Sequence, residues 1–296
     1  MVKILITGGT GTLGKALISK LYNDDVEIHI FSRDENKQKA LKAEYPKLVC
    51  HIGDVCDRDD LNRINYNKFS YVYHCAAMKH VEICEANVAK CVKTNYAGTR
   101  NVYWALGKSI GVKFCFFTTD KAVAPVNAYG HSKALAEKFL EEMNVIYNNA
   151  YIFRWGNILG STGSVLPIFV KQLLSGKPIT VTHTKMTRFW LPIDYASDFV
   201  LATVSGYKPG IHWPSSIRSS SLVLLIQEMA SILEIKNYEI KEIGLRPGEK
   251  IHEAMLDGPE GPIITSDDYS VYNAYDLNRL IRPIVLNIAD EVNRGT

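Results

Sequence analysis

The chain has 296 residues, of which 47% are hydrophobic and 22% charged, and its formal net charge is +3. This length suits one large domain or two unequal ones, and the composition allows a sizeable buried core. A net charge this small argues against nucleic acid or an anionic membrane as a partner. No apolar run reaches the roughly 20 residues that a membrane-spanning helix needs, and the N-terminus lacks a signal-peptide pattern, so we expect a cytoplasmic protein.

The cysteines give no sign of a metal site or a disulfide framework. All six lie in the first half of the chain, and none forms a CxxC pair. This spacing suits neither zinc nor a stapled secreted scaffold. We therefore expect reduced, buried thiols and no metal.

The first half of the chain alternates short β-rich runs with segments whose apolar residues recur at helical spacing. The predicted strands are 2–7, 26–32, 47–53, 70–76, 112–119 and 150–155. The predicted helices are 13–22, 59–64, 88–110 and 132–147. Apolar runs without alternation indicate strands buried on both faces, and β-α-β order indicates a parallel sheet. The fold class is therefore α/β, with a doubly wound parallel sheet (Rossmann-type) in a dinucleotide-binding domain over residues 1–155.

After residue 155 this regularity ends. Two further helices are predicted over 164–176 and 219–235, the second with a serine cap. Glycine and proline become denser, as in a lobe of loops and short elements. We expect a smaller C-terminal substrate-binding lobe over 156–296, from which segments can return to the sheet. No element is predicted after about residue 258.

A glycine-rich turn joins the first predicted strand to the first predicted helix, in GGTGTLG. The spacing Gly8-x-x-Gly11-x-x-Gly14 differs from G-x-G-x-x-G, but the physical reasons for the glycines are the same. Glycine allows the tight turn and the close approach of a pyrophosphate to the positive end of the helix. At the junction of the first βα unit, this turn predicts a dinucleotide site.

The end of the second predicted strand should lie near the adenosine ribose of the dinucleotide. Ser32, Arg33 and Asp34 stand there, with Lys37 one turn later. Arg33 and Lys37 could hold a 2′-phosphate, which favours NADP, whereas Asp34 could accept from the ribose of NAD. Asp54, after the third strand, is a candidate adenine contact and alternatively a helix N-cap.

Acidic, phenolic and ammonium side chains cluster after the fifth predicted strand, in TTDKAVAPVNAYGHSK (118–133). Tyr129 and Lys133 share one face of a helix, so the ammonium can lie close to the phenol and lower its pKa towards neutrality. The phenolate could then take a proton from a sugar hydroxyl while hydride passes to nicotinamide. An exposed helix turn is the alternative, but the place at the carboxyl edge of the sheet favours catalysis.

Together, the glycine spacing, Asn95 and Tyr129-x-x-x-Lys133 resemble the extended short-chain dehydrogenase/reductases that act on nucleotide sugars. Within that family, the closest resemblance is to the soluble UDP-N-acetylglucosamine 4,6-dehydratases. The matching segments, in chain order, are HCAAMKHVEICE, KTNYAGTRNV, TDKAVAPVNAYGHSK, FRWGNILGSTGSVLP, MTRFWL and RPGEKIHE, within roughly residues 1–256.

This resemblance implies a hydro-lyase that recycles its NADP. Tyr129 would deprotonate the sugar 4-hydroxyl, with Lys133 tuning it and Thr119 holding the oxygen, as hydride leaves C4. Asp120 as acid and Lys121 as base would then eliminate water across C5 and C6, and hydride would return to C6. Glucose-type 4,6-dehydratases typically have Asp-Glu where this chain has Asp-Lys.

A lysine can act as a base only if its pKa is lowered, by desolvation or by a cationic neighbour. Lys79 and the nicotinamide ring are the candidate neighbours of Lys121. We expect inversion at C5, because a lysine base could let solvent reprotonate the opposite face. Retention stays open, because related enzymes share most of these motifs.

Two ligand-binding sets follow from these residues and from the resemblance. The cofactor set is Gly8, Thr10, Gly11, Thr12, Leu13, Gly14, Ser32, Arg33, Asp34, Lys37, Asp54, Val55, Cys75, Ala76, Ala77, Lys79, Asn95, Tyr129, Lys133 and Ile158. The substrate set is Lys79, Asn157, Thr162, Gly163, Ser164, Val165, Arg188, Arg246 and Glu249. Arg188 and Arg246 suit a diphosphate, or alternatively surface ion pairs, and Glu249 suits a uridine ribose. At Thr162, relatives commonly have arginine.

Two other functions stay open. A nucleotide-sugar 4-epimerase of the same fold would keep Tyr129, Lys133 and the glycines, but it would not need Asp120 and Lys121. A non-catalytic NADP-binding regulatory protein would leave the tyrosine cluster unexplained. The resemblance further implies a role in polysaccharide biosynthesis and a homo-oligomer in which helices 88–108 and 126–147 pair across a two-fold axis.

Overall fold

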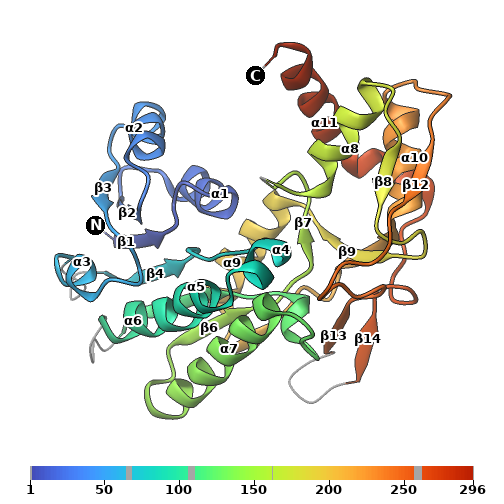
Figure 1. Cartoon of the computed structure of the whole chain (residues 1–296). Helices are drawn as coiled ribbons and strands as arrows, with labels where there is room; N and C mark the ends of the chain where they lie inside the picture. The colour runs from blue at the N-terminus through green and yellow to red at the C-terminus, as the bar shows by residue number, and fades with distance from the viewer. Residues whose placement is uncertain (1, 65–68, 106–110, 162, 257–261, 296) are drawn as a thin grey trace. The chain divides into compact units, whose positions relative to one another are not determined.

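The structure is a computed structural model that describes residues 2–64, 69–105, 111–161, 163–256 and 262–295 (Figure 1). The chain divides into two compact units. The first combines residues 1–154 with 196–213, and the second combines 155–195 with 214–296. Each unit has its own hydrophobic core.

In its described residues, the first unit is built on a seven-stranded sheet of order β10-β6-β5-β4-β1-β2-β3 (Figure 1). Its strands are β1 (Val2–Thr7), β2 (Val26–Ser32), β3 (Val49–Ile52), β4 (Tyr71–His74), β5 (Lys113–Phe117), β6 (Ala150–Phe153) and β10 (Gly210–His212). Every neighbouring pair is parallel. The connection reverses direction between β1 and β4, which is where sheets of this kind bind ligands. The predicted Rossmann-type fold class is confirmed.

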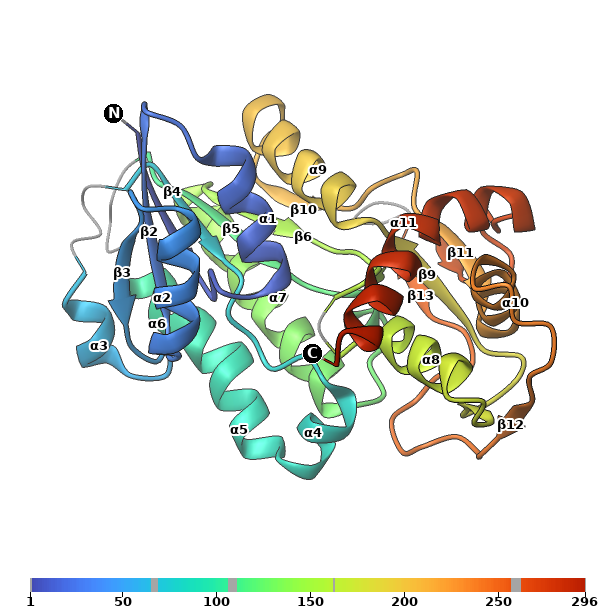
Figure 2. The same cartoon turned by 90° about the horizontal axis from the view of Figure 1, so that it is seen from above.

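The helices of this unit are α1 (Thr12–Leu21), α2 (Glu35–Glu44), α3 (Arg58–Asn62), α4 (Val81–Ala86), α5 (Val88–Val92), α6 (Gly98–Ala105), α7 (Ala128–Tyr147) and most of α9 (Ile193–Gly206). The helix predicted from residue 88 continues without a break from Val88 to Ala105, as α5, a π-helical turn at Lys93–Ala97, and α6. Such turns often mark functional sites, and this one carries Asn95. Helix α7 packs against α5 and α6 (Figure 2).

The second unit joins three helices with short strands. The helices are α8 (Val165–Leu174), α10 (Leu222–Ile232) and α11 (Ala274–Asn293). Strands β7 (Asn157–Ile158), β9 (Thr187–Leu191) and β11 (Arg218–Ser221) form one sheet, and the smaller pairs are β8 (Ile179–Val181) with β12 (Ile240–Glu242) and β13 (Ala254–Leu256) with β14 (Ile263–Thr265). The predicted serine cap is Ser221, whose hydroxyl accepts from the amide of Leu224 at 3.0 Å.

Helix α11 lies in the tail where no element was predicted. Its buried residues include Leu277, Ile281 and Val285, which repeat every four residues and face α8 and α10. Pro283 stands inside the helix and breaks the sequence signal, because proline normally ends a helical pattern. Burial of the apolar face of α11 therefore outweighs the helix-breaking effect of Pro283. Among the described residues, no helix is both long and apolar enough to cross a membrane.

Candidate active site

The glycine turn after β1 is packed too tightly for side chains. Gly8 has a φ of +66°, and a Cβ on it would lie 2.7 Å from the backbone nitrogen of Ala76. A Cβ on Gly14 would lie 2.6 Å from the Cα of Gly9. The turn therefore brings the first turn of α1 against the ends of β1 and β4, with Gly11 as the N-cap of α1. This arrangement fits a pyrophosphate at the N-terminus of α1.

Asp34 and Arg33, which follow β2, have different surroundings. Asp34 is the N-cap of α2, and its Oδ1 accepts from the amide of Lys37 at 3.0 Å. Arg33 is largely exposed, and its Nη1 lies 3.6 Å from Oδ2 of Asp54. Exposed ion pairs contribute little to stability, so this guanidinium is available to a ligand at small cost.

Asp54 does not cap a helix, so that alternative is wrong. Its Oδ1 accepts from the amide of Cys56 at 2.9 Å, and the N-cap of α3 is Asp57. Its backbone nitrogen is held by Oδ2 of Asp60 at 2.9 Å. The adenine contact at Asp54 stays a prediction, and Val55 beside it is buried.

Asn95 fastens the loop that follows β4. Its Oδ1 accepts from the amide of Met78 at 2.8 Å, and its Nδ2 donates to the carbonyl of Met78 at 2.9 Å. The same Nδ2 donates to Oγ of Ser132 on α7 at 3.0 Å. Asn95 thereby connects α7 to the segment that carries Cys75, Ala76, Ala77 and Lys79. Burial lowers the pKa of Lys79.

An acid and a base stand side by side after β5. Thr119 caps a short 3-10 turn, Asp120–Ala122, and its hydroxyl donates to Oδ1 of Asp120 at 2.9 Å. The Nζ of Lys121 lies 3.0 Å from the same Oδ1, and Asp120 is fully buried. A buried ion pair is weak evidence for stability, so its place at the carboxyl edge of the sheet points to chemistry.

The start of α7 is pressed against this turn. Asn127 caps the helix through a bond from the amide of Gly130 at 2.7 Å. A Cβ on Gly130 would lie 2.2 Å from the carbonyl oxygen of Lys121, so only glycine fits there. The close approach brings Tyr129 next to Thr119, whose side chain opposes the rise in the pKa of Tyr129. The sequence analysis missed the roles of Asn127 and Gly130, whose signal was the N-cap position and the glycine one residue after the tyrosine.

We expected Lys133 to lower the pKa of Tyr129, but in the structure other groups act on that pKa. Burial raises the pKa of Tyr129 to about 12, and the opposing, lowering influences are the charge of Lys121 and the side chain of Thr119. The Nζ of Lys133 instead donates to the carbonyl of Phe117 at 2.8 Å. Burial also lowers the pKa of Lys133 to about 8. The cation that favours the phenolate here is therefore Lys121.

The predicted substrate residues belong to the second unit, except for Lys79. Asn157 and Ile158 form β7, Gly163 has a φ of +73°, Ser164 is the N-cap of α8, and Val165 is its first residue. Thr162 lies outside the described residues.

Arg188 is buried and holds the segment that follows Arg246 and Glu249. Its Nη1 donates to the carbonyl of Ile251 at 3.0 Å and its Nη2 to that of Lys250 at 3.0 Å. Glu249 accepts from the backbone amide of Arg246 at 3.0 Å, which closes the RPGE turn. Arg188 is therefore no surface ion pair, and its contact with a diphosphate stays a prediction.

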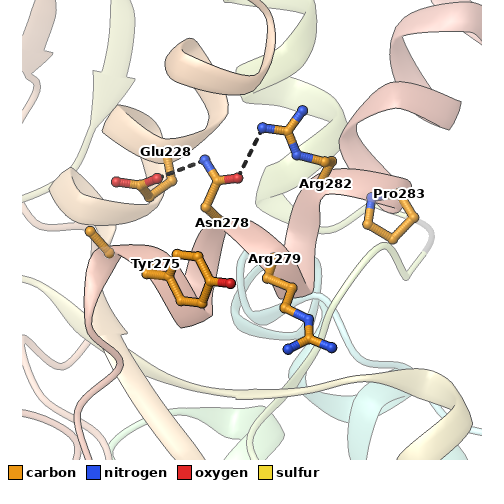
Figure 3. A pocket seen from close by; sticks show the side chains of 7 residues that line it. Glu228, Tyr275, Asn278, Arg279, Arg282 and Pro283 are labelled. Atoms are coloured by element: carbon orange, nitrogen blue, oxygen red, sulfur yellow. Dashed lines mark hydrogen bonds between the residues drawn. The ribbon is translucent and has the colours of Figure 1, made fainter.

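A separate pocket of about 450 Å³ lies on the second unit between α10 and α11 (Figure 3). Figure 3 shows Asn278 donating to Glu228 and accepting from Arg282. None of the predicted site residues lines it. Within the described ranges, no group of three or more His, Cys, Asp and Glu side chains is arranged to hold a metal ion.

Comparison with known proteins identifies a family and several relatives. The model of a family described as "Polysaccharide biosynthesis protein" matches residues 4–272. A UDP-N-acetylglucosamine 4,6-dehydratase (inverting) of Campylobacter jejuni is 37% identical over 289 residues, covering 94% of this chain and 83% of the relative. A UDP-glucose 4-epimerase of Rickettsia massiliae is 35% identical over 280 residues, covering 91% and 81%.

Solved structures show the same fold. Pen from Bacillus thuringiensis superposes with a TM-score of 0.85 at 30% identity, covering 95% of this chain and 96% of Pen. DesIV from Streptomyces venezuelae, a dTDP-glucose 4,6-dehydratase solved with NAD bound, has a TM-score of 0.78 at 21% identity, covering 95% and 96%. The similarity to DesIV supports the fold alone.

Proposed function

Because the chain belongs to the polysaccharide biosynthesis protein family, whose members compared above include nucleotide-sugar dehydratases and epimerases, we propose that it is a UDP-N-acetylglucosamine 4,6-dehydratase. The single observation that carries this proposal is the contact of 3.0 Å between Lys121 and Asp120, beside Tyr129. A 4-epimerase needs one base for its hydride transfer, whereas a dehydratase needs a second acid and a second base.

The Asp120–Lys121 pair can supply both the acid and the base of the elimination. An ammonium beside a carboxylate holds the same number of protons as an amine beside a carboxylic acid. Burial disfavours the charged form of the pair, and the contact allows one proton to move between Nζ and Oδ1. In the neutral form, Lys121 can remove the C5 proton while Asp120 protonates the departing 6-hydroxyl.

In the first step Tyr129 would act as the phenolate, which the charge of Lys121 favours, and would take the proton of the 4-hydroxyl, with Thr119 holding the hydroxyl oxygen. A bound nicotinamide would supply the chemistry of hydride transfer. The residues that would hold the cofactor are those of the glycine turn and the end of β2, and the tight Gly8 turn fits a pyrophosphate. Lys121 opposes the rise that burial causes in the pKa of Tyr129, so it serves both steps.

The first test is proton NMR of the purified protein with NADP+ and UDP-N-acetylglucosamine in heavy water. We expect a new C6 methyl signal with deuterium at C5, and ring couplings that report inversion at C5. A product with its 6-hydroxyl intact and the configuration changed at C4 would favour the epimerase. That second candidate is supported by the Rickettsia massiliae relative. An unchanged spectrum with this sugar and with UDP-glucose would contradict both enzymes and favour the NADP-binding regulatory protein.

We propose NADP over NAD because Arg33 is exposed at the end of β2 while Asp34 is occupied as a helix cap. An Arg33→Ala variant should bind NADP+ about tenfold more weakly, as the loss of roughly 1.4 kcal/mol implies, with little change for NAD+. Isothermal titration calorimetry with NADP+ and with NAD+ measures the two affinities. Lys39→Ala is the matched control, because Lys39 is an exposed cation on α2 that pairs with Glu35. Equal losses for both cofactors, or tighter binding of NAD+ by the wild type, would contradict NADP preference.

A homo-oligomer also stays a proposal. Exposed apolar side chains gather on α4 to α7, as the pairing of helices across a two-fold axis would require. They are Ile83, Val88, Val92, Trp104, Leu135, Val145 and Ile146.

A further inference from the structure

Glu137 and Arg154 form a second buried ion pair in the first unit, one helical turn beyond Lys133. Glu137 follows Lys133 by four residues on α7, so the two side chains share a helix face. The Nη2 of Arg154 lies 2.6 Å from Oε2 of Glu137, and its Nε lies 3.3 Å from Oε1. Both side chains are almost fully buried. The guanidinium stays charged at all ordinary pH values, so a permanent cation faces the Glu137 carboxyl group.

Lys133 is also buried, and the groups around it cannot take the place of Glu137. The carbonyl of Phe117 accepts from its Nζ at 2.8 Å, and the ring of Phe116 lies 4.4 Å from it. The titratable groups that face it from the other elements are His74 and Cys75 at the end of β4, Cys84 on α4 and Cys91 on α5. Burial raises the pKa of the Cys75 and Cys84 thiols and lowers the pKa of His74 to about 3, so Cys75, Cys84 and His74 are neutral at ordinary pH.

We propose that Glu137, held by Arg154, is a positioning residue that keeps Lys133 in its ammonium form beneath the active site. Burial pulls the pKa of Lys133 down to about 8, and the largest opposing influence is Glu137. The Lys133 ammonium has three N–H donors, and one of them is given to the carbonyl of Phe117, at the end of β5. What that charge contributes to turnover rests on the proposed function.

The direction of the expected change in the pH profile follows from the lowered pKa of Lys133. The Lys133 ammonium is present below about pH 8 and is lost above it. Removing the Glu137 charge lowers that pKa further, because one favourable interaction with the ammonium is gone. Loss of a unit charge one helical turn away shifts a pKa by about one unit. In Glu137→Gln we therefore expect the alkaline limb of kcat/KM to move about one pH unit towards acid.

A titration that needs no substrate tests the inference apart from the proposed function. In protein labelled with carbon-13 at the lysine Cε, the resonance missing from Lys133→Met belongs to Lys133. Its midpoint should lie near pH 8 in the wild type and about one unit lower in Glu137→Gln. Glu27→Gln is the matched control, because it removes another carboxylate that contacts basic side chains, Lys3 and His29, on β1 and β2.

A second variant covers the case in which Glu137→Gln does not fold. Glu137→Leu with Arg154→Met removes both charges at once, which proteins often tolerate better than one unpaired charge. It should lower the Lys133 midpoint in the same direction, since Glu137 is the partner that faces the lysine. An unmoved Lys133 midpoint in the folded variants would overturn the inference, whatever the activity. A moved midpoint in a protein that converts no sugar nucleotide would support the inference and contradict the proposed function.

Discussion

Tyr129→Phe should lose at least about a hundredfold and up to about ten-thousandfold in turnover, the range that general-base catalysis contributes. The change removes one hydroxyl and keeps the ring. Hydride cannot leave C4 unless the 4-hydroxyl loses its proton, so both elimination and reduction at C6 should stop together. The measurement is the rate of formation of the C6 methyl signal, beside the absorbance of reduced cofactor in a single turnover.

The variant should remain folded, because burial already disfavours the ionised phenol in the resting protein. Tyr147→Phe is the matched control, since it makes the same change at the other end of α7, where Tyr147 packs on Tyr103. We expect wild-type turnover from that control. If Tyr129→Phe retained wild-type turnover with an unchanged thermal unfolding curve, Tyr129 would not be the base.

Lys121→Met should separate the two halves of the reaction. Tyr129 still accepts the 4-hydroxyl proton, so hydride should still leave C4 and reduced cofactor should accumulate in a single turnover. The C5 proton then has no base, and formation of the C6 methyl group should fall about a hundredfold or more. The first half should also slow, because Lys121 lowers the pKa of Tyr129 and its removal leaves the phenol harder to ionise.

Lys138→Met is the matched control for this variant, since Lys138 is an exposed lysine on α7 that pairs with Glu141 at 2.8 Å. The double variant Asp120→Asn, Lys121→Met removes both members of the buried pair and tests whether an unpaired Asp120 causes the loss. Undiminished dehydration by Lys121→Met would assign the C5 proton to another group. Equal loss of both halves in every folded variant would indicate a structural role for the pair.

Several features of the molecule could be predicted from the sequence because they depend on neighbours along the chain. The bounds of β1 and β2 match the predicted 2–7 and 26–32, since strands buried on both faces are continuous apolar runs. The glycine turn between β1 and α1 was visible as a spacing, and its packing against Ala76 explains that spacing. The closeness of Tyr129 to the residues after β5 followed from the order of strand, turn and helix.

Tertiary structure decided the features that depend on burial and on distant partners. Lys133 turns to the carbonyl of Phe117, and desolvation, rather than a neighbouring ammonium, dominates the pKa of Tyr129. Spacing alone cannot show this, because the desolvation of a side chain depends on every element packed around it. For the same reason, the sequence alone did not show that Asp34 caps α2 or that Arg188 donates to the backbone carbonyls of residues 250 and 251.

The fold itself shows the same division. Strand β10 joins β6 after an excursion through the second unit, and α11 forms despite Pro283. Strand β10 is only three residues long, and Pro283 interrupts the amphipathic pattern of α11, so each element depends on contacts with residues far away in the sequence. Local periodicity determined which segments could be strands or helices. Burial of their apolar faces determined which of them form, and which charged groups remain charged at the active site.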